Sequence, residues 1–218
     1  ITFIGTSHIA RERVVEVEKE IAVTKPDIIA LELDNSRLSS LMTKKKRTLP
    51  AFRKFGFRGF LLNLIGAYIE KSLSKHTGIN PGTEMKTAIN LAKKQNIKIA
   101  LIDQPIEITI KKLISRITRK EKYQLLKDFL TAFFTNKKEI GFDLNKVPSS
   151  EIIKKLIKET KAKYPAVYRT LVTERNIIMG KALYKLMHEF PDKKILAIVG
   201  AGHEKGIMGE LKSMKNPN

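Results

Sequence analysis

Four short apolar segments, none of which alternates with polar residues, constrain the fold of this chain most strongly. These segments are residues 1–4, 27–33, 97–102 and 194–199. Ile, Val and Leu dominate them, which is typical of parallel strands that are covered on both faces. Segments with helical spacing of apolar residues separate the strands; the clearest are 11–22, 84–95 and 202–212. This order of elements predicts an α/β fold with a mainly parallel central sheet flanked by helices.

The 218 residues are enough for a single α/β domain, and we expect one domain over residues 1–218. Two stretches exceed what a strand–helix–strand unit needs, at about 44–80 and 107–190. The second has helical patterns and no strand pattern. We therefore expect a helical insertion that caps the carboxyl-terminal edge of the strands.

Strand-like segments at both ends of the chain lead into the same pattern, Gly-x-x-His. Gly5 precedes His8, and Gly200 precedes His203. Residues just past the carboxyl ends of parallel strands line the ligand crevice of an open sheet. His8 and His203 could therefore lie side by side, where they could bind a metal or transfer protons.

Glu32 is unusual because Leu31 and Leu33 flank it within a predicted strand. An ionised carboxylate in a dry interior is costly unless it is paired or bound to a metal. Three interpretations stay open. Glu32 could bind a metal, act as a general acid or base with a raised pKa, or form an ion pair with Arg37 that closes the strand–helix turn.

Arg175 lies on an otherwise apolar helix face and needs anionic partners if it is buried. It could bind a substrate carboxylate, polarise a carbonyl or bridge a helix to the sheet. Asn176 is placed to share its site, and Asp103 follows the third strand. Glu84 begins a helix, where an acid is favourable even without a function.

The chain is strongly basic, with 42 Lys and Arg residues against 22 Asp and Glu residues and a formal net charge of +20. Such a charge attracts nucleic acid or anionic membrane surfaces, although lysines spread along a solvated surface explain it equally well. Residues 52–60 interleave Phe with Arg and Lys and could stack on bases or lie on a membrane. The chain has no cysteine, which excludes disulfides and thiolate sites.

Six sequence segments, in order along the chain, resemble the TraB family, the pheromone-shutdown group. They are Gly5-Thr6-Ser7-His8-Ile9, Glu32-Leu33-Asp34-Asn35-Ser36-Arg37, Pro81-Gly82-Thr83-Glu84-Met85, Ile102-Asp103, Glu174-Arg175-Asn176 and Val199-Gly200-Ala201-Gly202-His203-Glu204-Lys205-Gly206-Ile207. That family looks related to Tiki proteases and to the erythromycin-esterase and ChaN-like folds. The resemblance implies an α/β fold in which His8, His203 and Glu32 surround one site.

The resemblance also carries expectations about activity and location. Tiki-like members are described as metal-dependent proteases, and ChaN-like relatives bind haem. TraB relatives often continue into membrane-spanning helices, so we expect a domain cut from a membrane-associated protein and lying on its cytoplasmic side. The chain opens inside a predicted strand without Met, which fits a part of a longer protein. Two positions depart from the family: Gln104 is often arginine there, and Asn176 is often aspartate.

We therefore expect a metal-dependent hydrolase of peptides or of similar amides and esters. His8, Glu32 and His203 would bind a divalent ion, Mn, Co or Zn. Arg37 and Arg175 would orient the substrate or stabilise an oxyanion, helped by Asn176. Glu84 or Asp103 would support the metal ligands or transfer protons. The alternatives are a protein that sequesters a peptide or haem without turnover, and a basic protein that binds membranes or, less expectedly, nucleic acid. The oligomeric state stays open.

Overall fold

A four-stranded parallel sheet forms the centre of the molecule in a computed structural model, which describes residues 1–6, 10–43, 82–134 and 150–216. The strands are β1 (Thr2–Thr6), β2 (Ile28–Leu31), β3 (Lys98–Leu101) and β4 (Ile195–Gly200). Their order across the sheet is β1-β4-β2-β3, and every neighbouring pair is parallel. The predicted α/β class is confirmed.

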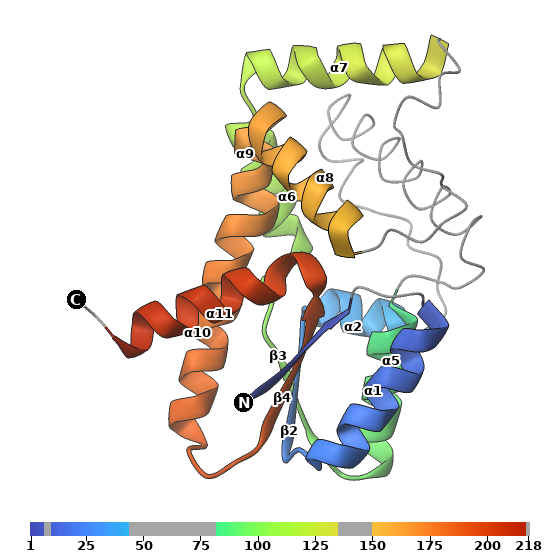
Figure 1. The fold of residues 1–218 in the computed structure, drawn as a ribbon, viewed down its shortest axis with the longest axis vertical. Coiled ribbons are helices and arrows are strands. Elements are labelled where there is room, and N and C mark those ends of the chain that lie inside the picture. The colour runs from blue at the N-terminus through green and yellow to red at the C-terminus, as the bar shows by residue number, and fades with distance from the viewer. Residues whose placement is uncertain (7–9, 44–81, 135–149, 217–218) are drawn as a thin grey trace.

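Helices cover both faces of this sheet and extend beyond it (Figure 1). They are α1 (Ala10–Thr24), α2 (Asn35–Met42), α5 (Thr83–Lys94), α6 (Ile106–Arg116), α7 (Arg119–Phe134), α8 (Ser150–Lys163), α9 (Pro165–Tyr168), α10 (Glu174–Glu189) and α11 (Ala201–Lys215). A π-helical turn, η1 (Arg169–Thr173), joins α9 to α10. Figure 1 shows α6 to α9 beyond the carboxyl ends of the strands, where we expected the helical insertion.

The core divides into two layers because the strands send alternate side chains to opposite faces. Ile29 and Leu31 of β2 pack toward α1 and α5, and Ile28 and Ala30 pack toward α10 and α11. All four of these side chains are almost completely buried. This two-sided burial accounts for the apolar pattern of β2 without alternation, and β4 shows the same pattern for the same reason.

The outer strands differ from the prediction, which treated all four strands as covered on both faces. Strand β3 has a single strand neighbour, and its residues are half-buried or exposed, with Lys98 exposed. Strand β1 lies at the other edge, and Ile4 is its one residue described as buried. An edge strand has one side without a neighbour, so its apolar sequence does not guarantee burial.

Several predictions concern residues outside the described ranges. These are His8, the segment 52–60 and the insertion at about 44–80. The single-domain prediction stays a prediction. Among the described residues, no helix is both long enough and apolar enough to cross a bilayer.

Candidate functional site

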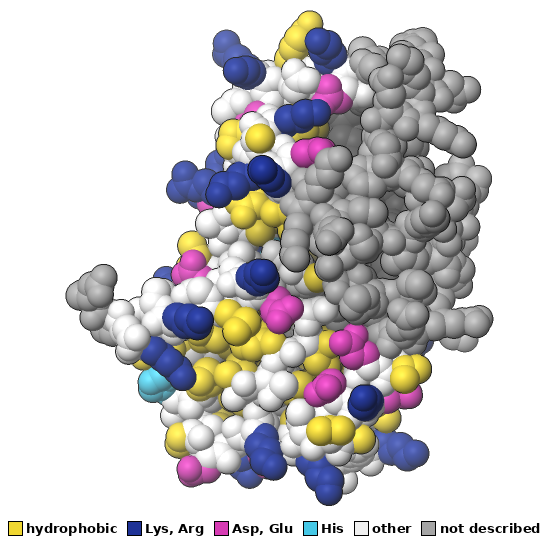
Figure 2. Space-filling view, viewed as in Figure 1, with side chains coloured by type: hydrophobic (Ala, Val, Ile, Leu, Met, Phe, Trp, Pro, Cys, Tyr) yellow, Lys and Arg dark blue, Asp and Glu magenta, His cyan; other side chains and the backbone are white. Residues whose placement is uncertain are grey.

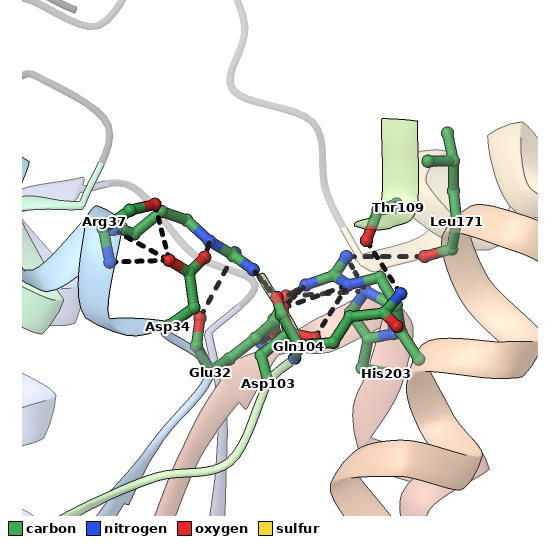
Figure 3. Close-up of polar contacts among 11 residues, drawn as sticks. Glu32, Asp34, Arg37, Asp103, Gln104, Thr109, Leu171 and His203 are labelled. Atoms are coloured by element: carbon green, nitrogen blue, oxygen red, sulfur yellow. Dashed lines mark hydrogen bonds and ion pairs between the residues drawn. The ribbon is translucent and has the colours of Figure 1, made fainter. Parts of the chain in front are cut away.

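Polar side chains from five elements meet at the carboxyl edge of the sheet (Figure 3). Glu32 follows β2, and Asp103 comes two residues after β3. Arg175 lies in the first turn of α10, and His203 lies in the first turn of α11. Arg37, in the first turn of α2, completes the set. Neighbouring parallel strands bring residues that are distant in sequence to one edge, as we expected.

Both carboxylate oxygens of Glu32 are engaged. Oε2 accepts a hydrogen bond of 2.7 Å from the backbone N–H of Gly200, at the end of the neighbouring strand β4. Oε1 forms an ion pair with Nη2 of Arg175. A Cβ at position 200 would lie 3.3 Å from Oε2, so glycine lets the carboxylate approach the backbone closely. The predicted ion pair between Glu32 and Arg37 is wrong. Nη1 of Arg37 reaches only the carbonyl oxygen of Glu32, at 3.5 Å.

Asp103 links the two arginines, and its side chain is completely buried. Arg175 donates to it from Nη2 over 2.6 Å and from Nε over 3.1 Å. Arg37 pairs with the same carboxylate through Nη2. Burial alone would raise the pKa of Asp103, but the bonds and charges of Arg175 and Arg37 outweigh it and lower the pKa. Asp103 is therefore a fixed anion that positions both guanidinium groups.

Asp34 holds Arg37 from the other side. It caps α2 by accepting hydrogen bonds from the backbone N–H groups of Ser36 and Arg37, and it accepts a bond of 2.6 Å from Nε of Arg37. Burial opposes the charged form, but these bonds outweigh it and lower the pKa of Asp34 to about 2. Together, Glu32, Asp34 and Asp103 set three carboxylates against two guanidinium groups, which leaves one formal negative charge when His203 is neutral.

His203 is held in one orientation by Asn176. Its Nδ1 lies 2.7 Å from Oδ1 of Asn176, an oxygen that can only accept, so Nδ1 carries the proton. Its Nε2 therefore has a free lone pair, which lies 3.0 Å from Nη1 of Arg175 and 3.6 Å from Oε1 of Glu32. Burial is the main cause of a lowered pKa at His203; the charge of Glu32 opposes this shift, and that of Arg175 adds to it. The imidazole is neutral at pH 7.

Gly206 makes room for this pair, and sequence analysis did not single it out. A Cβ at that position would overlap Nδ2 of Asn176. The available signal was a glycine three residues after His203, inside a predicted helix, where glycine is unfavourable without a packing reason. The next residue after His203, Glu204, has its carboxylate against Gly5 of β1.

Gln104 is buried beside Asp103 but turns away from the arginines. Its side-chain amide donates a hydrogen bond of 2.8 Å to the hydroxyl of Thr109 in α6. Its backbone N–H donates to Asp103 over 2.8 Å. The position that is often arginine in the TraB family thus connects the site to the helices beyond the sheet, without adding charge.

The structure does not bring Glu84 into this cluster, and it does not describe His8. Glu84 is buried in the first turn of α5 but makes no ion pair or hydrogen bond with the described residues of the site. His8 lies outside the described residues, two positions after Thr6, which is paired with Gly200. His188 is exposed near the end of α10, where its Nδ1 lies 2.9 Å from the carbonyl oxygen of Tyr184.

The side chains of this site are of the type that binds a divalent cation. The described residues supply fewer of them than a metal site needs. Metal-binding histidines usually donate one ring N–H to an oxygen and present the other nitrogen to the metal, as His203 does. The described residues contain no group of three His, Asp or Glu side chains arranged to hold a metal. The described donors are Glu32 and His203, and Arg175 supplies the positive charge between them. A cation would need Arg175 to move, because its Nη1 contacts Nε2 of His203 and its Nη2 pairs with Oε1 of Glu32.

Known proteins and one family profile are similar to this chain along all or nearly all of its length. The profile of the TraB/PrgY/gumN family matches residues 1–218. An uncharacterized protein of Methanocaldococcus jannaschii is 38% identical over 224 residues, covering 100% of this chain and 55% of that protein. TraB domain-containing proteins of Homo sapiens and Bos taurus are each 23% identical over 230 residues, covering 94% of this chain and 60% of theirs. The chain thus spans little more than half the length of these relatives.

Proposed function

The chain belongs to the TraB/PrgY/gumN family, and on that premise we propose that it is a hydrolase that depends on a divalent cation and acts on peptides or similar amides and esters. The observation that carries this proposal is the state of His203. A buried, neutral imidazole accepts from Nη1 of Arg175 at Nε2, and Oε1 of Glu32 lies 3.6 Å from the same nitrogen, so the two acceptors could share one cation. The surrounding network has one carboxylate more than it has guanidinium groups, which favours an added cation.

His203 through Nε2, Glu32 through Oε1 and His8, which follows β1 in the sequence, would hold the cation. Two histidines and one carboxylate leave positions for water and substrate, as catalytic sites require. A bound Mn, Co or Zn ion would lower the pKa of its water toward about 7 and so supply hydroxide. Asn176 would keep the histidine in the tautomer that presents Nε2.

Arg175 is placed to bind the substrate. Its Nη1 lies 3.0 Å from Nε2 of His203 and 3.4 Å from the carbonyl oxygen of Leu171, while Asp103 holds its other nitrogens. Once Nη1 leaves His203, it can donate to the carbonyl oxygen of a substrate and stabilise the negative charge that forms there. Asp103 and Arg37 are positioning residues in this scheme, because both act through Arg175.

Metal binding by the purified protein tests the cation site directly. We expect the wild type to bind one Mn, Co or Zn ion, and H203A and E32Q to weaken that binding at least about tenfold, the loss typical of altered metal ligation. H188A is the matched control, since it removes an exposed histidine on α10 and should leave the affinity unchanged. Equal affinities in H203A and H188A would contradict the cation site.

Hydrolysis needs its own measurement. A mixture of synthetic peptides, incubated with metal-loaded protein and analysed by mass spectrometry, should give cleaved products that H203A and R175A do not produce. If the loaded wild type binds a peptide but yields no product, the hydrolase proposal fails and sequestration without turnover replaces it.

We also propose membrane association for the longer protein. This proposal rests on the family resemblance and on relatives that extend beyond the matched region.

A further inference from the structure

A cluster of basic side chains surrounds a single carboxylate on the helices beyond the sheet. Glu174, the first residue of α10, forms an ion pair with Arg116 and lies 3.3 Å from Nζ of Lys112, both on α6. Nε of Arg169, in η1, lies 3.7 Å from the same carboxylate. Three cations surround this carboxylate, and a second carboxylate, that of Glu121, accepts from the backbone N–H of Ala166 nearby, so a surplus of one positive charge remains. Nothing in the proposed hydrolase site uses this surplus.

Two of these arginines also line an open groove. The groove has a volume of about 410 Å³, and its lining residues are Arg116, Pro165, Ala166 and Arg169. This size lies within the range of sites that hold small molecules. Pro165 and Ala166 bring no side-chain acceptor, so the guanidinium groups dominate its polarity. Figure 2 shows Lys and Arg side chains spread over this upper part of the surface.

These arginines have N–H groups that donate no hydrogen bond to any described residue. Arg169 is exposed and contacts Glu174 only through Nε, and its two Nη groups make no hydrogen bond with any residue in the described part of the chain. Each guanidinium group has five N–H donors in a planar fork that matches phosphate oxygens. The nearby backbone N–H of Ala166 already donates to Glu121, so the arginines and not the helix end would hold a ligand.

We propose that this groove binds the phosphate group of a small phosphate monoester. A phosphate monoester carries a charge of about −1.5 to −2 at pH 7, and the surplus of positive charge at this groove favours such an anion. Arg116 and Arg169 would bind its oxygens, and Lys112 would add charge from the side. Because none of the described residues that line the groove belongs to the network of Glu32 and His203, the hydrolase proposal and this one can fail separately.

Calorimetric titration with phenyl phosphate and with inorganic phosphate tests this assignment. The protein is treated with EDTA at low salt, so that no metal captures the ligand. We expect R169Q and R116Q each to weaken the affinity about tenfold, and the double variant to abolish measurable binding. K185Q removes an equal charge from an exposed position on α10 and should leave the affinity within about twofold.

A substitution of Glu174 should raise the affinity for phenyl phosphate, whereas the arginine substitutions should lower it. It competes with the ligand for the same cations, so E174Q should bind phenyl phosphate several-fold more tightly than the wild type. If R169Q binds as well as K185Q, or if E174Q binds more weakly than the wild type, the proposal is wrong. R169Q keeps the test decisive even if R116Q does not fold, because Arg169 is 73% exposed and its guanidinium makes a single ion pair among the described residues. Binding of inorganic phosphate but not of phenyl phosphate would also overturn the proposed ligand class.

Discussion

Asp103 shows how a completely buried carboxylate is tolerated in this protein. Burial of an isolated charge costs several kcal/mol, and the side chain of Asp103 has no exposed surface. Two guanidinium groups and the backbone N–H of Gln104 surround it. Its removal would leave Arg37 and Arg175 with fewer anionic partners in a site with little water.

We therefore expect D103N to lower the free energy of unfolding by about 3 kcal/mol, because it breaks a buried ion pair and leaves the cations in place. Urea denaturation followed by circular dichroism measures this change. D192N is the control, since Asp192 is exposed, and it should change stability by less than about 0.5 kcal/mol. A D103N protein as stable as D192N would show that the network does not depend on this charge.

The sequence indicated which residues are unusual but not which of them touch. Glu32 between two leucines and Arg175 on an apolar helix face were both identifiable as charges that need partners. Their pairing with each other joins residues 143 positions apart and depends on how α10 packs against β2. The predicted pair of Glu32 and Arg37 was local, and Arg37 instead bridges Asp34 to Asp103.

Helix α11 positions His203 and contains two glycines with different surroundings. A Cβ at Gly206 would overlap the amide of Asn176, whereas a Cβ at Gly209 would meet no atom within 4 Å. Glycine inside a helix usually costs about 0.5–1 kcal/mol relative to alanine. Gly206 offsets that cost by letting Asn176 reach the imidazole, and Gly209 shows no such gain.

The two alanine variants should therefore change stability in opposite directions. We expect G209A to raise the free energy of unfolding by about 0.5–1 kcal/mol. G206A should lower it and displace Asn176 from His203, which two-dimensional NMR of the imidazole nitrogens would detect as a changed tautomer. If both variants are stabilising and the imidazole signals stay the same, the close contact at Gly206 has no role in positioning His203.

Element positions were largely predictable, because periodicity reports them directly. The predicted strand 194–199 is observed as Ile195–Gly200, and the predicted helix 84–95 as Thr83–Lys94. The place of β1 and β3 at the sheet edges was not predictable, since strand order depends on contacts between distant segments. The π-helical turn η1 was not predicted either, because its residues have an ordinary helical pattern.

For the molecule as a whole, we expect the free energy of unfolding to depend on pH through the protonation of His203. Burial lowers its pKa in the folded protein from the ordinary value of 6.5. Below that pH the unfolded chain takes up a proton that the folded protein does not, so the free energy of unfolding falls with decreasing pH. The stability contribution is complete above about 6.5 and decreases from there toward the folded pKa.

We expect urea denaturation between pH 5 and 8 to show this decline in the wild type and in H188A. H203A should show a shallower slope, because the buried group that stays neutral is gone. The comparison uses slopes, so a constant loss of stability in H203A does not affect it. The same slope in all three proteins would mean that folding does not lower the pKa of His203.

The π-helical turn η1 precedes two consecutive residues, Glu174 and Arg175, whose side chains lie in different clusters. Glu174 turns toward the cations of α6 and the groove, while Arg175 turns toward Glu32 and Asp103. The N–H of Glu174 bonds to the carbonyl oxygen of Arg169, five residues back, so the turn contains one residue more than an α-helix would. Loss of a single residue from 169–173 would rotate α10 by about 100° against the preceding helix. A chain shortened there could keep every charged side chain and still lose both clusters, so the spacing of this segment matters as much as its chemistry.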